Sequence, residues 1–197
     1  MATPTIVYLH GFRSSPASVK ATQFRQAVEM LPIEVRPQLH VPDLQHRPSA
    51  AIAQVADWVA QCANIADLTF VGSSLGGYYA THLAERFGAR AAMINPAVRP
   101  YEDLKPYVGM QTNMYSGETF VVTPAHFAEL AALGVGRITR PSRYLLLVQT
   151  GDEVLDWREA VAFYAGAWQY VEGGGDHAFQ RFAAQIPVVL RFAGVAP

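Results

Sequence analysis

The chain has 197 residues, of which 51% are hydrophobic and 16% charged, and its formal net charge is −1. This length fits a single domain over residues 1–197 with a sizeable core, and the near-balanced charge gives no indication of a nucleic acid or an anionic membrane surface as partner. The single cysteine excludes an internal disulfide, no apolar run approaches the ~18 residues of a membrane span, and no signal-peptide pattern precedes the first strand, so we expect a cytoplasmic protein.

Short apolar runs alternate with amphipathic segments along most of the chain. This pattern predicts strands at residues 5–9, 38–41, 68–71, 91–95, 144–149 and 168–171. It predicts helices at residues 16–31, 48–64, 75–87, 156–165 and 178–192, the last with a kink at Pro187. Strands that alternate with helices form βαβ units, so we expect an α/β protein with a parallel sheet.

Residues 96–142 break this alternation and are too long for a simple crossover. They contain five prolines, several tyrosines and one predicted helix at residues 124–133, with Thr123 as its cap. We interpret the segment as a cap or lid over the carboxyl edge of the sheet. The alternative is an ordinary crossover helix with long loops.

The motif Gly72-x-Ser74-x-Gly76 lies between an apolar strand and a helix, which is the setting of a nucleophile elbow. A serine at the tip of such a turn is held in a strained conformation, and its neighbours must be small because strand and helix backbones pass close together. We therefore predict that Ser74 is a catalytic nucleophile. The alternative is a plain strand-to-helix turn. A phosphate-binding loop is disfavoured, because the Gly-Lys-Ser/Thr that such a loop requires does not follow this stretch.

A serine nucleophile needs a base, and reactive groups collect at the carboxyl ends of parallel strands. His177 follows the last strand in a glycine-rich loop and is the best candidate, the alternative being an exposed loop histidine. We expect His10 to brace its loop and the other histidines to be structural or on the surface, with His46 and His126 exposed. No histidine cluster has metal-ligand spacing, so no metal is predicted.

The acid that orients the base should also follow a strand. Asp152 comes first after the glycine that ends the strand at residues 144–149, and Glu153 is the weaker alternative. Asp156 is predicted to be the N-cap of the next helix, with Glu159 completing a capping box. The order Ser, Asp, His along the chain is typical of the architecture that carries this elbow.

The developing oxyanion needs two backbone donors. We expect one from the amide of Leu75, beside the nucleophile, and one from the amide of Phe12, in the loop after the first strand. Gly11 would let that loop approach the substrate.

Five motifs together resemble those of the α/β-hydrolase superfamily and, more narrowly, of the small bacterial YqiA-like esterases. They are Leu9-His10-Gly11-Phe12, Gly72-Ser73-Ser74-Leu75-Gly76-Gly77, Asn95-Pro96-Ala97, Thr150-Gly151-Asp152-Glu153-Val154-Leu155-Asp156 and Gly174-Gly175-Asp176-His177. The resemblance spans nearly the whole chain and implies a Ser74–Asp152–His177 triad on a three-layer α/β-hydrolase fold. It implies a sheet trimmed to six strands. With the strands numbered along the chain, their order across the sheet is 2-1-3-4-5-6. Arg13 departs from the pattern, because such esterases often have a small polar residue there.

The expected activity is therefore hydrolysis of a small carboxylic ester through an acyl-enzyme intermediate, without a cofactor. Acyl-CoA thioester hydrolysis is the alternative within the class, and basic residues that flank the cap could supply its binding patch: Arg99, Lys105, Arg137, Arg140 and Arg143. Solvated surface charge is the preferred interpretation of these residues. A non-catalytic binding module on a hydrolase fold is the alternative from another class. Aromatic residues of the cap suggest an apolar acyl site, the alternative being that they form the core of the cap itself: Tyr101, Tyr107, Tyr115, Phe120 and Phe127.

Overall fold

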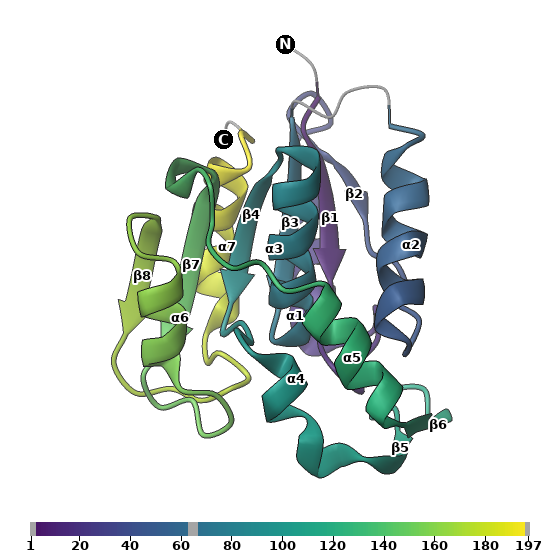
Figure 1. The fold of residues 1–197 in the computed structure, drawn as a ribbon. Helices are drawn as coiled ribbons and strands as arrows, with labels where there is room; N and C mark the ends of the chain where they lie inside the picture. Colours follow the sequence, from purple (N-terminus) through teal and green to yellow (C-terminus); the bar gives the residue numbers. More distant parts are fainter. Residues whose placement is uncertain (1–2, 63–66, 196–197) are drawn as a thin grey trace.

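A computed structural model describes residues 3–62 and 67–195 of the chain (Figure 1). A parallel six-stranded sheet has the order β2-β1-β3-β4-β7-β8. Its strands are β1 (Thr5–Leu9), β2 (Gln38–His40), β3 (Leu68–Ser73), β4 (Arg90–Ile94), β7 (Tyr144–Gln149) and β8 (Trp168–Glu172). Since β7 and β8 are the fifth and sixth predicted strands, the predicted fold class and strand order are confirmed.

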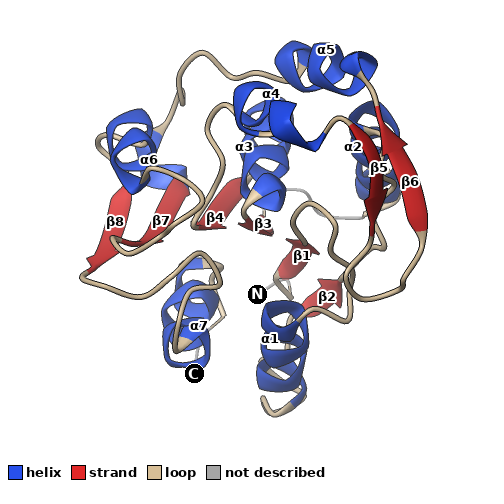
Figure 2. Cartoon of the chain, turned by 90° about the horizontal axis from the view of Figure 1, so that it is seen from below, coloured by secondary structure: helices blue, strands red, loops and turns tan. Residues whose placement is uncertain are grey.

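Helices cover both faces of this sheet, as Figure 2 shows. One face carries α1 (Val19–Glu29) and α7 (Phe182–Phe192), and the other carries α2 (Pro48–Val59), α3 (Leu75–Phe87) and α6 (Trp157–Phe163). The result is the three-layer arrangement that the alternating pattern predicts. Within the described residues, no helix combines the length and apolarity that crossing a membrane requires.

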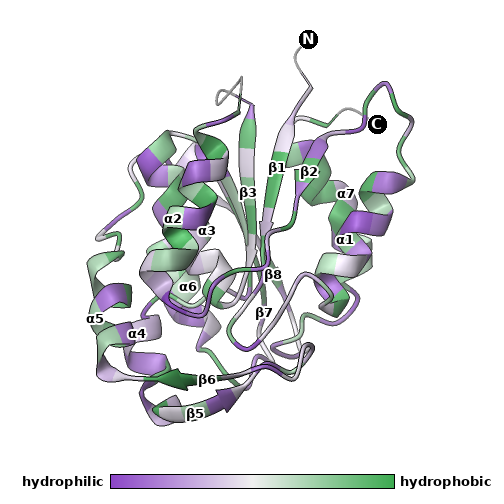
Figure 3. Ribbon diagram, turned by 90° about the vertical axis from the view of Figure 1, so that its right-hand side faces the viewer, coloured by the Kyte–Doolittle hydropathy of each residue, from purple (hydrophilic) through white to green (hydrophobic). Residues whose placement is uncertain are grey.

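Strand β7 shows why the central strands have nearly continuous apolar sequences. All six of its residues are buried. Leu146 and Val148 pack into the core beneath α2, α3 and α6, whereas Leu145 and Leu147 pack into the core beneath α1 and α7. A strand buried on both faces has no polar face. Figure 3 shows green segments along β1 and β3, whereas the helices beside them mix green with purple.

Two helices begin later than the sequence predicts. Helix α1 begins at Val19 rather than at residue 16, because Ser15 accepts hydrogen bonds from the Ala17 and Ser18 amides and closes a turn first. Helix α7 begins at Phe182 rather than at residue 178, because the positive φ angles just before it interrupt helical geometry. Helix α2 ends at Val59, and its predicted end near residue 64 lies outside the described residues.

The segment between β4 and β7 holds elements that sequence periodicity did not predict. It contains α4 (Pro100–Asp103), η1 (Lys105–Tyr107), an antiparallel hairpin of β5 (Gly109–Thr112) and β6 (Thr119–Val122), α5 (Pro124–Ala132) and η2 (Pro141–Arg143). The predicted helix and its Thr123 cap are present in α5. His126, predicted to be exposed, is buried because its ring completes that cap with Thr123.

The β5–β6 hairpin is attached to the loop that follows β1, below the carboxyl ends of the strands (Figure 1). Arg13 Nε donates to the Thr112 carbonyl at 3.1 Å, and the Arg13 carbonyl accepts from the Met114 amide at 2.9 Å. Asn113 Nδ2 donates to the Ser14 carbonyl at 2.8 Å. Arg13, the residue that departs from the esterase pattern, therefore joins the β1 loop to the hairpin.

Candidate active site

Ser74 lies at the junction of β3 and α3 in a strained backbone conformation, with φ 55° and ψ −122°. A positive φ is unfavourable for a residue with a side chain, so the surroundings must hold it there. The Ser74 amide donates to the Ile94 carbonyl at 3.0 Å, and the Ser74 carbonyl accepts from the amides of Gly77 and Ala97 at 2.9 and 3.1 Å. These bonds fix the predicted elbow and present the side chain at the carboxyl edge of the sheet.

Two glycines let the strand and helix backbones meet at this turn. A Cβ atom at Gly72 would overlap the carbonyl of Gly76, and one at Gly76 would overlap the carbonyl of Leu9. Both obstacles are backbone atoms that cannot rotate away. The glycine spacing of the motif is therefore a packing requirement of the elbow.

We expect the Gly76→Ala variant to lower the free energy of unfolding by about 3 kcal/mol, because the added methyl must displace β1 or α3. Denaturant unfolding monitored by tryptophan fluorescence measures this change. Gly136→Ala is the matched control, since a Cβ at Gly136 would meet nothing within 4 Å. Equal unfolding midpoints for the two variants would contradict the packing argument.

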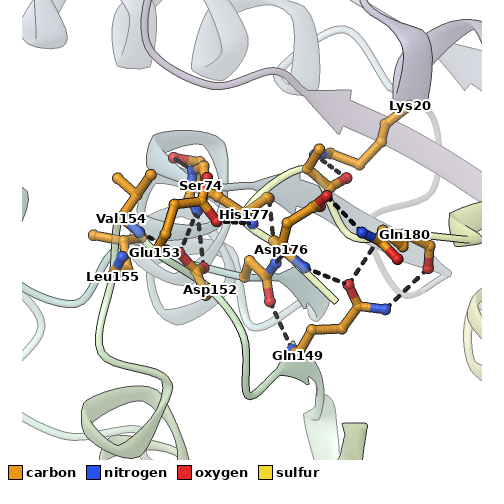
Figure 4. Close-up of polar contacts among 12 residues, drawn as sticks. Lys20, Ser74, Gln149, Asp152, Glu153, Val154, Leu155, Asp176, His177 and Gln180 are labelled. Atoms are coloured by element: carbon orange, nitrogen blue, oxygen red, sulfur yellow. Dashed lines mark hydrogen bonds and ion pairs between the residues drawn. The ribbon is translucent and has the colours of Figure 1, made fainter. Parts of the chain in front are cut away.

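His177 connects Ser74 to Asp152 through hydrogen bonds at both ring nitrogens (Figure 4). Its Nε2 lies 3.0 Å from Ser74 Oγ, and its Nδ1 lies 2.8 and 3.0 Å from the two carboxylate oxygens of Asp152. An ionised carboxylate only accepts hydrogen bonds, so Nδ1 carries the ring proton and Nε2 is free to accept from the serine hydroxyl. The structure thus brings together three residues that follow three different strands.

The environment of Asp152 favours its ionised form. Its side chain is only 2% exposed. Burial acts to raise the pKa of this carboxyl, but hydrogen bonds from His177 and from the Leu155 and Val154 amides outweigh burial and hold the pKa below its ordinary value. The charge on Asp152 is therefore available to orient the ring and to stabilise its protonated form.

The neighbouring acidic residues have other partners. The Glu153 carboxylate accepts from the backbone amide of His177 at 3.0 Å, so it contacts the histidine loop rather than the ring. Asp156 caps α6 as predicted, accepting from the Arg158 amide at 2.9 Å. The predicted capping box is wrong, because Glu159 forms an ion pair with Arg99 instead.

The loop after β1 packs directly against Ser74. A Cβ at Gly11 would lie 3.2 Å from Ser74 Cβ and 3.7 Å from Ser74 Oγ, so the glycine lets the loop come this close. Within the part of the chain that the structure describes, the amides of Phe12 and Leu75 donate no hydrogen bond. His10 braces this loop by accepting from the Leu44 amide at 3.1 Å, and burial lowers its pKa.

Two buried amide side chains hold the histidine loop, and sequence reasoning missed both. Asn95, after β4, donates to the carbonyls of Asp176 and His177 at 2.9 and 3.2 Å. Gln149, at the end of β7, accepts from the amides of Asp176 and Gln180 at 3.2 and 2.8 Å, as Figure 4 shows, and donates to the Gln180 carbonyl at 2.9 Å. The available signal was a polar residue ending each apolar strand, since a buried polar group needs partners.

We expect Gln149→Leu to lower kcat by about 10- to 100-fold, because the unsupported loop would misplace the His177 ring. Steady-state hydrolysis of a p-nitrophenyl ester measures this loss. Gln169→Leu is the matched control, since Gln169 also donates to two carbonyls, those of Val161 and Tyr164. An equal loss of kcat in both variants would show a general effect on stability and not one on the loop.

Among residues 3–62 and 67–195, no group of three or more His, Cys, Asp or Glu side chains is arranged to hold a metal ion. Beside Ser74 and His177 lies a cavity of about 530 Å³. A second cavity of about 180 Å³ is lined by Phe12 and Leu75 on the side of the β5–β6 hairpin. Space for a substrate therefore lies on both sides of the loop after β1.

Comparison with known proteins gives matches over nearly the whole chain. The family model described as "Uncharacterised protein family (UPF0227)" matches residues 5–194. A UPF0227 protein of Shewanella baltica strain OS185 is 26% identical over 199 residues, covering 95% of this chain and 98% of that protein.

Solved structures match the fold at lower identity. A protein of Agrobacterium vitis S4 described as a hydrolase has a TM-score of 0.77 and 18% identity, covering 98% of this chain and 88% of its own. The esterase domain of a Rhodothermus marinus protein has a TM-score of 0.66 and 18% identity, with the same coverage of 98% and 88%. At these identities the likeness establishes the fold, which is that of the α/β hydrolases.

Proposed function

The chain belongs to the UPF0227 family, and we propose that it is a serine hydrolase that cleaves carboxylic esters through an acyl-enzyme intermediate. The observation that carries this proposal is the continuous hydrogen-bonded series from Asp152 through His177 to the strained Ser74. A serine held only as a turn residue needs neither a base at its hydroxyl nor a buried carboxylate behind that base. The esterase domain of similar fold supports the same reaction class.

In the first step, Ser74 Oγ attacks the ester carbonyl while His177 Nε2 takes its proton. Asp152 stabilises the resulting imidazolium, and its hydrogen bonds to Nδ1 keep the ring in the orientation that faces the serine. The free amides of Phe12 and Leu75 are the donors proposed for the oxyanion of the tetrahedral intermediate. His177 then gives its proton to the leaving alcohol, and the acyl group stays on Ser74.

In the second step, a water molecule takes the place of the alcohol. His177 removes a proton from this water as it attacks the acyl-enzyme carbonyl, and the same two amides stabilise the second oxyanion. Collapse of that intermediate returns the proton to Ser74 and releases the carboxylic acid. The residues in the proposed mechanism are those that follow β1, β3, β7 and β8.

We also propose that residues 96–142 form a cap over this site. Support comes from the hydrogen bonds that attach the β5–β6 hairpin to Arg13 and Ser14, in the loop that carries the proposed Phe12 donor. A segment fixed to this loop limits how a substrate can approach Ser74. The cap is therefore the part of the chain from which we expect substrate selectivity.

Acyl-CoA hydrolysis is the second candidate, and the partners of the basic residues near the cap bear on it. Arg99 pairs with Glu159, Lys105 with Glu102 and Arg143 with Glu85, whereas Arg137 and Arg140 form no ion pair within the described residues. Two of the five candidate cations are therefore left fully available to the phosphates of CoA.

A panel of p-nitrophenyl esters of increasing acyl length, assayed beside the corresponding acyl-CoAs, tests this assignment. We expect higher kcat/KM for the esters than for the thioesters. The reverse order would make the protein a thioesterase. Absence of turnover on both series would favour a non-catalytic binding module.

A further inference from the structure

The 530 Å³ cavity extends from the Ser74–His177 pair to the beginning of α1. Its wall contains a lysine, a buried tyrosine and the last part of the histidine loop. The lining residues that matter here are Tyr8, Lys20, Ser74, Glu153, Asp176 and His177. The cavity is thus shared between the proposed nucleophile and a cationic side chain.

Lys20 is only partly paired within the protein. Its ammonium donates to the Ala178 carbonyl at 2.9 Å (Figure 4), and within the described residues it forms no ion pair with a carboxylate. An ammonium has three donors, so two remain for a ligand. Burial lowers the pKa of Lys20 to about 8, although the charges of Asp176 and Asp152 act in the opposite direction.

Two further features of the same wall favour a negatively charged group. The Tyr8 hydroxyl is buried, and no hydrogen-bond partner for it exists in the described part of the chain. The 11-residue helix α1 begins at this wall, and its first internal hydrogen bond joins the Thr22 amide to the Ser18 carbonyl. The amides of Val19 and Lys20 precede that bond, and the positive end of the helix dipole adds to the lysine charge.

Two carboxylates also line the cavity, and both accept hydrogen bonds from residues of the histidine loop. Glu153 accepts from the His177 amide, and Asp176 accepts from Gln180 Nε2 at 2.9 Å. Neither carboxylate forms an ion pair with Lys20, and Asp176 Oδ1 is buried without a hydrogen-bond partner among the described residues. Of the two long cationic side chains on this wall, Arg181 pairs with Glu172, so Lys20 is the one that has no carboxylate partner within the described residues.

We infer that the cavity selects esters that carry a carboxylate, which pairs with the Lys20 ammonium while the ester carbonyl lies at Ser74 Oγ, with the Tyr8 hydroxyl as a second donor. This inference rests on the proposed ester hydrolysis and adds a substrate class to it. It places a carboxylate-binding end on the α1 side of the nucleophile. The carboxylate belongs either to the acyl part or to the alcohol part of the ester.

Two pairs of matched esters test the inference and show whether the carboxylate belongs to the acyl part or to the alcohol part of the substrate. The acyl pair is mono-p-nitrophenyl succinate and its methyl ester, and the alcohol pair is para-acetoxybenzoate and its methyl ester. In at least one pair, we expect the wild-type protein to hydrolyse the anionic member with the higher kcat/KM. Because a hydrogen-bonded charge contributes about 1.5–3 kcal/mol, Lys20→Met should lower the anionic-to-neutral ratio of kcat/KM in that pair by about 10- to 100-fold.

Controls separate this role from a structural one. Lys20→Arg should keep most of the ratio, and Arg86→Met, which removes an exposed cation in the last turn of α3, should leave the ratio unchanged. If Lys20→Met lowers kcat/KM equally for both members of each pair, Lys20 only supports the Ala178 carbonyl and the inference is wrong. Wild-type preference for the neutral member in both pairs would overturn it as well, whereas hydrolysis of none of the four esters would refute the proposed function itself.

Discussion

Replacing Ser74 by alanine is expected to lower ester hydrolysis by about 10⁴-fold or more, the loss typical of a triad nucleophile. The variant keeps the elbow glycines and all the backbone bonds that hold residue 74, so it should fold like the wild type. What it loses is the only oxygen within hydrogen-bond reach of His177 Nε2 among the described residues. Steady-state turnover of p-nitrophenyl acetate measures the effect.

Ser142→Ala is the control for this variant, because Ser142 is an exposed residue of η2. We expect it to hydrolyse esters at the wild-type rate. Turnover by Ser74→Ala within about tenfold of the wild type would remove the nucleophile from the proposed mechanism.

Replacing Asp152 by asparagine is expected to lower kcat by about 10³- to 10⁴-fold with little change in KM. An asparagine amide is neutral, and it can donate to Nδ1, which would favour the wrong ring tautomer and leave Nε2 protonated. In that state His177 cannot accept the serine proton. The variant therefore tests the direction of the hydrogen bonds as well as the identity of the acid.

Glu153→Gln provides the matched control, because Glu153 adjoins Asp152 but contacts the His177 backbone amide. Its kcat should fall by less than about tenfold, since an amide oxygen can replace the carboxylate as acceptor. If Glu153→Gln proved the more damaging substitution, the acid would be Glu153.

The depressed pKa of Asp152 also has a consequence for stability. A carboxyl whose pKa is lower in the folded protein contributes stability above its unfolded pKa, and this contribution is lost as the pH falls through the folded pKa. We therefore expect the difference in free energy of unfolding between the wild type and Asp152→Asn to shrink as the pH is lowered below 4, near the ordinary pKa of Asp. Denaturant unfolding at a series of pH values measures this difference.

The parts of the site that were predictable are encoded in short stretches of sequence. The elbow can be found from Gly72, Ser74 and Gly76, because the steric requirement involves residues two apart. Asp152 and His177 could be selected because each follows a strand, and parallel strands end at one edge of the sheet. The sheet order itself came from the resemblance and is confirmed by the strand pairing.

The parts that were missed depend on contacts between distant residues. Gln149 bonds to Asp176 and Gln180, which are 27 and 31 residues away, and its local signal, a polar residue at the end of an apolar strand, does not identify these partners. The β5–β6 hairpin is largely exposed, so its strands lack the apolar alternation that reveals a strand. His126 was misplaced because a histidine that caps a helix has no distinctive sequence pattern.

The central claim is that Ser74 is an activated nucleophile, and covalent labelling with a fluorophosphonate tests it most directly. Such reagents react with serines that a neighbouring base has activated. We expect one adduct per chain, located by peptide mass spectrometry on Ser74, absent from Ser74→Ala and accompanied by loss of ester hydrolysis. Ester hydrolysis that persists in a protein exposed to excess reagent, with Ser74 unlabelled, would contradict the account.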